Sequence, residues 1–320
     1  MFRNTRATVA GFPGRRAHLI ALQAPADADD PRPALASEFE ADGNAEAAAA
    51  FTPDFTDDPR VDWLAELLRR QASEKILLIC RTQAKALAID AALRLRINVK
   101  AAVFHEGLPL VQRDRNAAWF AEEDGARLLI ASEIGGEGRN FQFARHLVLF
   151  DLPLDPETLE QRIGRLDRIG QRHEIQIHVP FVVNSPQEVL ARWYHEGLNA
   201  FEHNLPSGRT LIEEFGARLV DLAQDFHETH PASRATLETL VRDSRAARLQ
   251  LAERLEQGRD RLLEMNSFRA DAVAPLLREL QTADVDPTLE HFMIEVFDHF
   301  NIQLEEIGPR TYRLDRKSVV

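Results

Sequence analysis

KILLICRTQAKALAIDAALRLRINVKAAVFH, residues 75–105, is the stretch of sequence that decides the fold. Residues 75–80 form a short apolar run fit for a buried strand, and residues 82–96 have helical spacing. Residues 99–105 form a second strand-like run. Two apolar strands joined by a helix run parallel in one sheet, and the helix covers one face of that sheet. The stretch therefore predicts a parallel sheet rather than a β-hairpin.

The same alternation continues along the chain. We expect helices over residues 110–123 and 155–169, and further strands over residues 126–132, 146–151 and 174–181. The expected fold class is α/β, a parallel sheet with helices on both faces. In such sheets ligands bind at the carboxyl ends of the strands, so the active edge is expected there.

The flanking regions have a different composition. Residues 1–22 are basic and turn-rich and end in a possible short strand, whereas Gln23 to Pro59 are rich in Ala, Asp, Glu and Pro and are expected to form a linker. Strand signals stop near Pro186, and the chain beyond is helical and heavily charged. We therefore predict an N-terminal segment and linker (1–59), an α/β domain (60–205) and an all-helical region (206–320).

Composition narrows the class of protein. The 320 residues carry a net charge of −12, which argues against binding nucleic acid through bulk positive potential but leaves local contacts possible. No apolar run has the length of a membrane span, and the start lacks the layout of a signal peptide. Cys80 is the single cysteine and excludes an internal disulfide. A cytoplasmic protein without a membrane partner is expected.

The turn SEIGGEGRNF (132–141) follows an expected strand. Its glycines would let backbone amides approach a phosphate or a nucleic-acid backbone. The turn is not a P-loop, because no Gly-Lys-Ser/Thr occurs in the sequence, and its glycines do not fit the dinucleotide fingerprint. A purely structural strand-to-helix turn is an equally good interpretation of the spacing alone.

The segment EQRIGRLDRIGQ (160–171) carries Arg162, Arg165 and Arg168 at intervals of three, which places them on one face of a helix. Ile163, Leu166 and Ile169 can pack inward beside them. One interpretation is a solvated face paired with nearby acids. Two interior glycines are costly in a helix, however, and arginines directed at the carboxyl edge suit a phosphate clamp. We favour the clamp.

Other candidate ligands are weaker. His105 and His178 stand at strand ends, where packing or hydrogen bonding explains them better than catalysis. No Cys/His cluster has the spacing of a metal site, so no metal site is predicted.

QRIGRLDRIGQ (161–171) resembles motif VI of the Swi/Snf-type ATPases, matched at Gln161, Arg165, Arg168, Gly170 and Gln171. ASEIGGEGRNF (131–141) is similar to their motif V, and LFDLPLDP (149–156) to the segment that joins the two motifs. FHEGLPLVQRDRNAAWF (104–120) is similar to the block between motifs IV and V. Within this superfamily the amino-acid sequence most resembles that of ATPases associated with RNA polymerase. The resemblance extends along nearly the whole chain except the Ala/Asp-rich stretch.

The resemblance implies the second RecA-like lobe of a two-lobed motor, the helicase C-terminal lobe, followed by a helical spacer. In this family ATP is hydrolysed between the lobes, and the first lobe brings the P-loop lysine and the acidic Mg²⁺ site. ATP and Mg²⁺ are therefore the implied cofactors, bound mainly by a lobe that this chain does not resemble. RNA polymerase and double-stranded DNA are the implied partners.

Site residues follow from the same resemblance. The implied catalytic arginine fingers are Arg165 and Arg168. The implied ATP-binding residues are Gly138, Asn140 and Gln161, and the implied nucleic-acid contacts are Arg81, Gly107, Ser132 and Gly135. Arg162 lies outside the matched pattern and is expected at the surface or against a partner. The sequence departs from the family where Ser132 replaces a frequent Thr and Glu133 a frequent Arg.

Two functions remain open from sequence. The first is half of an ATP-dependent translocating motor that remodels or recycles RNA polymerase and is inactive alone. The alternative is a non-catalytic RecA-like module that binds a partner. At Met1 the sequence already resembles an internal part of the family's sequence, and the resemblance stops near Leu314. These two limits suggest a fragment. Residues 315–320 read like translated adapter sequence, or else form an ordinary charged tail.

Overall fold

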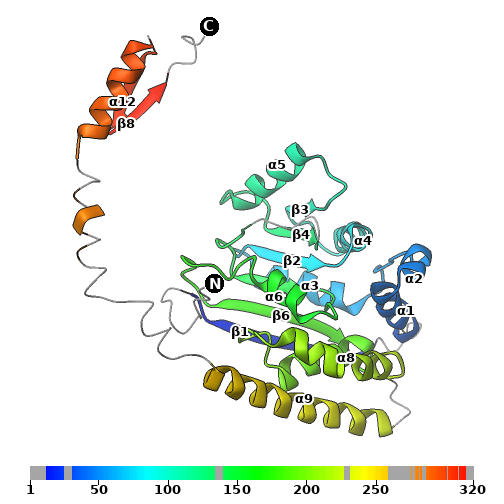
Figure 1. Cartoon of the computed structure of the whole chain (residues 1–320). Coiled ribbons are helices and arrows are strands. Elements are labelled where there is room, and N and C mark those ends of the chain that lie inside the picture. Colours follow the sequence, from blue (N-terminus) through cyan, green and yellow to red (C-terminus); the bar gives the residue numbers. More distant parts are fainter. Residues whose placement is uncertain are drawn as a thin grey trace. The chain divides into compact units, whose positions relative to one another are not determined.

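A computed structural model describes residues 12–24, 31–133, 140–226, 231–258, 275, 278–280, 282, 286–300, 302–308 and 310–314. The chain divides into two compact units, Met1–Glu253 and Arg254–Val320, and each is described by itself. The first unit contains the large sheet (Figure 1).

The large sheet has six strands in the order β1-β6-β5-β2-β4-β3, and every neighbouring pair is parallel. Its strands are β1 (Arg15–Leu22), β2 (Ile76–Cys80), β3 (Ala101–Phe104), β4 (Leu128–Ser132), β5 (His146–Leu149) and β6 (Ile175–Val182). The predicted strands and their parallel direction are confirmed. The register pairs Cys80 with Ser132, so the ends of β2 and β4 lie level at the carboxyl edge.

Alternate residues of the central strands belong to two separate cores, as the two-residue period of a strand requires. Ile76, Leu78 and Cys80 pack toward α3 (Pro59–Arg70) and α4 (Gln83–Arg94). Leu77 and Ile79 pack on the other face, which is covered by α6 (Pro156–Ile163), α7 (Pro186–Arg192) and α8 (Gly208–Gln224). Burial on both faces explains why these strands are apolar throughout.

Side-chain caps begin two of the helices that leave the carboxyl edge, α4 and α6. The Thr82 side chain accepts a hydrogen bond from the Lys85 amide at the start of α4, and the Asp155 side chain accepts one from the Glu157 amide at the start of α6. Pro156 occupies the first turn of α6, where its missing N–H costs nothing. Helix α5 (Leu110–Ala121) connects β3 to β4.

The N-terminal segment differs from the linker expected over 23–59. β1 joins the sheet beside β6, and residues 32–50 form α1 (Arg32–Gly43) and α2 (Ala45–Ala50). In Figure 1 these two helices lie beyond the arrowheads of β2 and β6, at the carboxyl edge of the sheet. Composition underestimated this segment because one of its acids, Glu38, is buried by pairing with cations that lie far away in sequence.

Helical structure follows β6, as expected. α7 continues as a π-helical turn (Trp193–Gly197), and α8 and α9 (Pro231–Gly258) come next. The second unit contains α12 (Thr288–His299) and an antiparallel pair, β7 (Leu304–Gly308) and β8 (Thr311–Leu314). The expectation of an all-helical end is therefore wrong at this hairpin, whose Gly308–Pro309 turn signal was overlooked. Among the described helices, none has the length and apolar character needed to cross a membrane.

Candidate nucleotide and nucleic-acid interface

Three of the residues expected to contact nucleic acid lie just at or beyond the ends of adjacent strands. Arg81 follows β2, Ser132 ends β4, and Gly107 stands three residues after β3. The Glu133 amide donates to the Arg81 carbonyl oxygen at 3.4 Å, which joins the first two segments. The parallel sheet therefore brings together residues that are 25 to 51 positions apart in sequence.

Ser132 has less freedom to bind a phosphate than the sequence suggested. Its side chain is buried, and its hydroxyl donates a hydrogen bond to Glu106 Oε2. Gly107 is packed against Gln83, so closely that an added Cβ would collide with the Gln83 amide group. Glu106 and Gln83 were both missed from sequence, because only the fold places α4 and the end of β3 together.

The arginine segment does not form one continuous helix. α6 ends at Ile163, Gly164 caps it, and Arg165 and Arg168 lie in the turns that follow. The three arginines therefore have different surroundings: Arg162 is buried, Arg165 is half-buried and Arg168 is exposed. Ile163 and Leu166 are buried as expected, but Ile169 is 59% exposed because the helical face ends before it.

Arg162 is not a surface residue, which corrects the expectation from sequence. Its Nη1 donates to the Asp151 carbonyl oxygen at 2.8 Å and to Asp151 Oδ1 at 2.9 Å, and its Nε donates to Glu133 Oε2 at 3.0 Å. Burial by itself would lower the pKa of Arg162, but Asp151 and Glu133 outweigh it and raise that pKa. Arg162 thus joins the ends of β4 and β5 to α6. One partner of Arg162 is Glu133, which stands at a position where the family often has Arg.

Two hydrogen bonds, one between backbone groups and one from a side chain, hold the segment of the two expected arginine fingers beside residues 141–144. The Phe141 amide donates to the Arg165 carbonyl oxygen at 2.9 Å, and Gln171 Nε2 donates to the Ala144 carbonyl oxygen at 2.9 Å. Gly170 adopts φ +95°, a conformation that favours glycine. The loop that carries Arg168 is therefore fixed at both of its ends.

The residues expected near ATP are only partly described. Asn140 is exposed, and its side-chain oxygen accepts a hydrogen bond from the Gln142 amide at 3.1 Å. Gln161 is exposed on α6, two residues before the helix ends at Ile163. Gly135 and Gly138 lie outside the described residues.

A buried cluster of charges at the carboxyl edge was missed from sequence. Lys85 Nζ lies 2.9 Å from Glu38, 2.6 Å from Asp42 and 3.1 Å from Asp151. Oxygens of these three carboxylates lie within 4.8 Å of one another, a grouping that could hold a metal ion. The Lys85 ammonium already supplies their positive charge, so the cluster fits an internal ion pair better than a metal centre. Glu38 and Asp42, four residues apart on α1, were its only sequence signal.

Of the two histidines expected at strand ends, His105 follows the end of β3, whereas His178 lies inside β6, which corrects the expectation from sequence. His105 is buried. His178 is stacked between His18 and His146, with ring centroids 5.0 and 5.3 Å away. Burial, with His146 next in effect, lowers the pKa of His178 to about 3. Both histidines remain better explained by packing than by catalysis.

Comparison with known proteins agrees with this geometry. Residues 59–170 match the family model of the helicase conserved C-terminal domain, and residues 174–319 match that of the RNA polymerase recycling family C-terminal region. The chain is 45% identical over 310 residues to the RNA polymerase-associated protein RapA of Pseudomonas putida KT2440, and 45% identical over 311 residues to RapA of Stutzerimonas stutzeri A1501. Each match covers 96% of this chain and 32% of the relative. The chain therefore spans about a third of the length of the curated relatives it matches.

Two solved structures are similar to part of this chain. The C-terminal part of the Fun30 ATPase domain superposes with a TM-score of 0.41 at 20% identity and covers 53% of each chain. The C-terminal domain of the DEAD-box protein Dbp5 gives a TM-score of 0.36 at 22% identity, covering 42% of this chain and 76% of the other.

The parallel sheet, its motif-bearing edge and the match over residues 59–170 define the class: this chain contains a RecA-like helicase C-terminal lobe. More particularly, the chain is a homologue of the C-terminal part of RapA, to which 96% of its length is similar.

Proposed function

We propose that this chain is the second motor lobe of an ATP-dependent, DNA-translocating ATPase that remodels or recycles RNA polymerase. ATP and Mg²⁺ would be bound mainly by a first lobe with a P-loop, a motif that this sequence does not contain. Arg165 and Arg168 would reach the γ-phosphate when the two lobes close. RNA polymerase is proposed as a partner because the relatives are named for their association with it.

The observation that supports the proposal most is the fixed position of the segment that carries Arg165 and Arg168. Phosphoryl transfer is catalysed mainly by positioning and by charges placed in advance around the transferring group. The Phe141–Arg165 hydrogen bond and the buried Leu166 hold this segment, while Arg168 stays exposed to meet an incoming phosphate. A pair of guanidinium groups so placed can stabilise charge that develops in the transition state.

The nucleic-acid backbone would cross the carboxyl ends of β2, β3 and β4. Arg81, 40% exposed in its side chain, offers a cation there, and the turn at Gly107 would offer a backbone amide. Gly135 is proposed as a further contact on the motif resemblance alone. Because Ser132 already donates to Glu106, a phosphate would have to replace that carboxylate as its acceptor. Contacts of this kind position a strand without reading its sequence.

A chimera tests the proposed function. The present chain replaces the matched 310 residues of Pseudomonas putida RapA, and ATP hydrolysis is measured with and without double-stranded DNA and RNA polymerase. We expect the chimera to hydrolyse ATP and the 320-residue chain alone to stay at background at every ATP concentration. A folded chimera that binds RNA polymerase without hydrolysing ATP would instead favour a non-catalytic binding module.

A further inference from the structure

Helix α1 covers basic groups at the same edge where nucleic acid is proposed to bind. Asp42 Oδ1 lies 3.8 Å from Arg81 Nε, and Asp42 Oδ2 lies 2.6 Å from Lys85 Nζ. Glu38 accepts a hydrogen bond from Arg60 Nη2 at 2.7 Å and pairs with Lys85 at 2.9 Å. Carboxylates of α1 therefore occupy positions around these cations where phosphate oxygens could bind.

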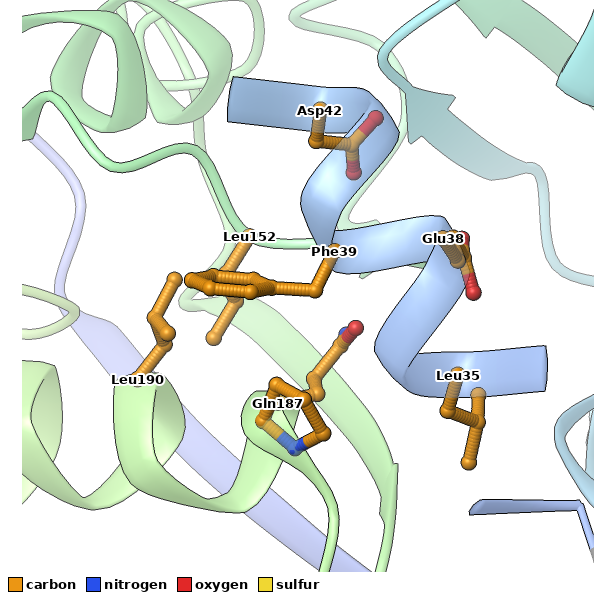
Figure 2. A pocket seen from close by; sticks show the side chains of 8 residues that line it. Leu35, Glu38, Phe39, Asp42, Leu152, Gln187 and Leu190 are labelled. Atoms are coloured by element: carbon orange, nitrogen blue, oxygen red, sulfur yellow. The ribbon is translucent and has the colours of Figure 1, made fainter. Parts of the chain in front are cut away.

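Few apolar side chains of α1 are buried against the rest of the protein. The buried side chains of the helix are Leu35, Glu38 and Ala41, and one of these three is an acid. Figure 2 shows Phe39 of α1 pointing toward Leu152 and Leu190, and these three side chains help to line a pocket beside the helix. Because little apolar surface fixes the helix, its attachment depends on the ion pairs, and competing anions can weaken these.

The carboxylates around Lys85 are not equally compensated, because Glu38 also pairs with Arg60 and Asp151 also pairs with Arg162, whereas the second cation near Asp42 is the more distant Arg81. Lys85 alone faces three carboxylates, those of Glu38, Asp42 and Asp151. Burial, followed by repulsion from Asp151 and Glu38, raises the pKa of Asp42 to about 7 despite its contact with Lys85. Asp42 is thus the carboxylate that the cluster holds least firmly in its charged form, and it lies 3.8 Å from the Arg81 guanidinium group.

We propose that α1 is an autoinhibitory strap, in which Asp42 and Glu38 hold the place of nucleic-acid phosphates beside Arg81 and Lys85. A nucleic-acid backbone displaces α1 and exposes Lys85, which is 2% exposed in its side chain while the strap is in place. The lobe then gains at least one further cation for phosphate. The proposal rests on the proposed role of Arg81 as a backbone contact.

The test compares two isosteric substitutions in the 320-residue chain. Asp42→Asn removes the charge nearest to Arg81, and Asp57→Asn removes the same charge from an exposed turn. Binding of a fluorescent duplex DNA is measured by anisotropy over a range of salt concentrations. We expect Asp42→Asn to bind about fivefold or more tightly than Asp57→Asn, with a salt slope steeper by about one, as one added phosphate contact requires.

Two further measurements separate the strap from the proposed nucleic-acid contact. Arg81→Ala should weaken DNA binding both by itself and in combination with Asp42→Asn. If Arg81→Ala leaves binding unchanged in both backgrounds, the proposed contact itself is wrong. If Arg81→Ala weakens binding but Asp42→Asn equals Asp57→Asn, only the strap is wrong. Hydrogen exchange of α1 amides in the unmutated chain should accelerate at saturating DNA, and an unchanged rate would equally overturn the strap.

Discussion

Arg165 and Arg168 differ from Arg162 in what surrounds each guanidinium group. Arg162 is 2% exposed and is fully engaged by Asp151 and Glu133, whereas Arg168 is exposed beyond the end of α6. A group already neutralised inside the fold cannot meet a phosphate. Burial therefore argues against Arg162 as a finger, and the assignment of Arg165 and Arg168 stays a prediction from the motif.

Loss of either proposed finger should affect hydrolysis more than nucleotide binding. In the RapA chimera, Arg165→Ala or Arg168→Ala should lower the rate of ATP hydrolysis by about a hundredfold or more, because such arginines act mainly on the transition state. ATP affinity, measured separately by equilibrium binding, should remain nearly unchanged. Arg168→Lys should not restore the rate, since lysine lacks the planar fork.

The matched control for these substitutions is Arg172→Ala. Arg172 is exposed and stands just beyond the motif. The Arg172→Ala substitution removes one positive charge from the same segment and leaves the proposed fingers, Arg165 and Arg168, unchanged. Equal damage from Arg172→Ala would show that the segment is a general basic docking face.

Arg162 should be a stability residue. Arg162→Ala leaves the buried Asp151 and the half-buried Glu133 without their shared cation, and removal of one partner from a buried pair costs about 3–5 kcal/mol. Urea unfolding of the 320-residue chain should show this loss, whereas Arg172→Ala should change the free energy of unfolding by less than about 0.5 kcal/mol. A stable, folded Arg162→Ala protein would contradict the buried pairing.

At the scale of elements, the attachment of β1 to the sheet has a feature that responds to pH. His18 of β1, His178 of β6 and His146 of β5 stack on one face of the sheet, and Trp63 of α3 lies against His178. His146 Nδ1 lies 3.0 Å from His178 Nε2. Burial lowers the pKa of both His146 and His178, and the nearby Arg70 and Arg145 act in the same direction, against Glu74.

Stability should therefore fall on mild acidification. An unfolded histidine takes up a proton near pH 6.5, whereas His178 resists protonation down to about pH 3 in the folded state. Its stabilising contribution is complete above about pH 6.5 and is lost as pH falls, by at most about 1.4 kcal/mol per pH unit. Urea unfolding at about pH 7.5 and pH 5.5 measures this loss.

The comparison of variants isolates the histidine contribution. Asp42, with its raised pKa, gives the opposite slope, because its charged form is disfavoured in the folded state. His178→Gln should reduce the loss between the two pH values, and His173→Gln, at an exposed position, should not. Identical pH profiles for the two variants would rule out a role for the stacked histidines.

At the scale of the whole molecule, the net charge of −12 governs binding to DNA. The proposed phosphate contacts are few and local, so the 320-residue chain should bind duplex DNA weakly, with a Kd above about 1 μM near physiological salt. Affinity should drop steeply as salt rises, because each contact releases a counterion. Anisotropy titrations measure both quantities, and submicromolar binding would indicate a separate basic site.

The sequence alone determined the fold class and the direction of the strands. Apolar runs at 75–80, 126–132 and 146–151 alternate with amphipathic segments, and a short apolar strand between helices is stable only when both of its faces are covered. The motif pattern likewise identified the segments that carry Arg165, Arg168 and Ser132. The apolar periodicity and the motif spacing each involve residues that are close together in sequence, so both can be recognised without the structure.

Only the tertiary structure decided which charges are buried and what they face. Arg162 has the same local spacing as Arg165 and Arg168, yet it alone lies beneath the ends of β4 and β5. The residues from Gln23 to Pro59 have the composition of a linker, yet α1 docks because Arg60 and Lys85 come close to Glu38 in space. The free energy of a charged group depends on its partners and its solvation, and both are set by segments far away along the chain.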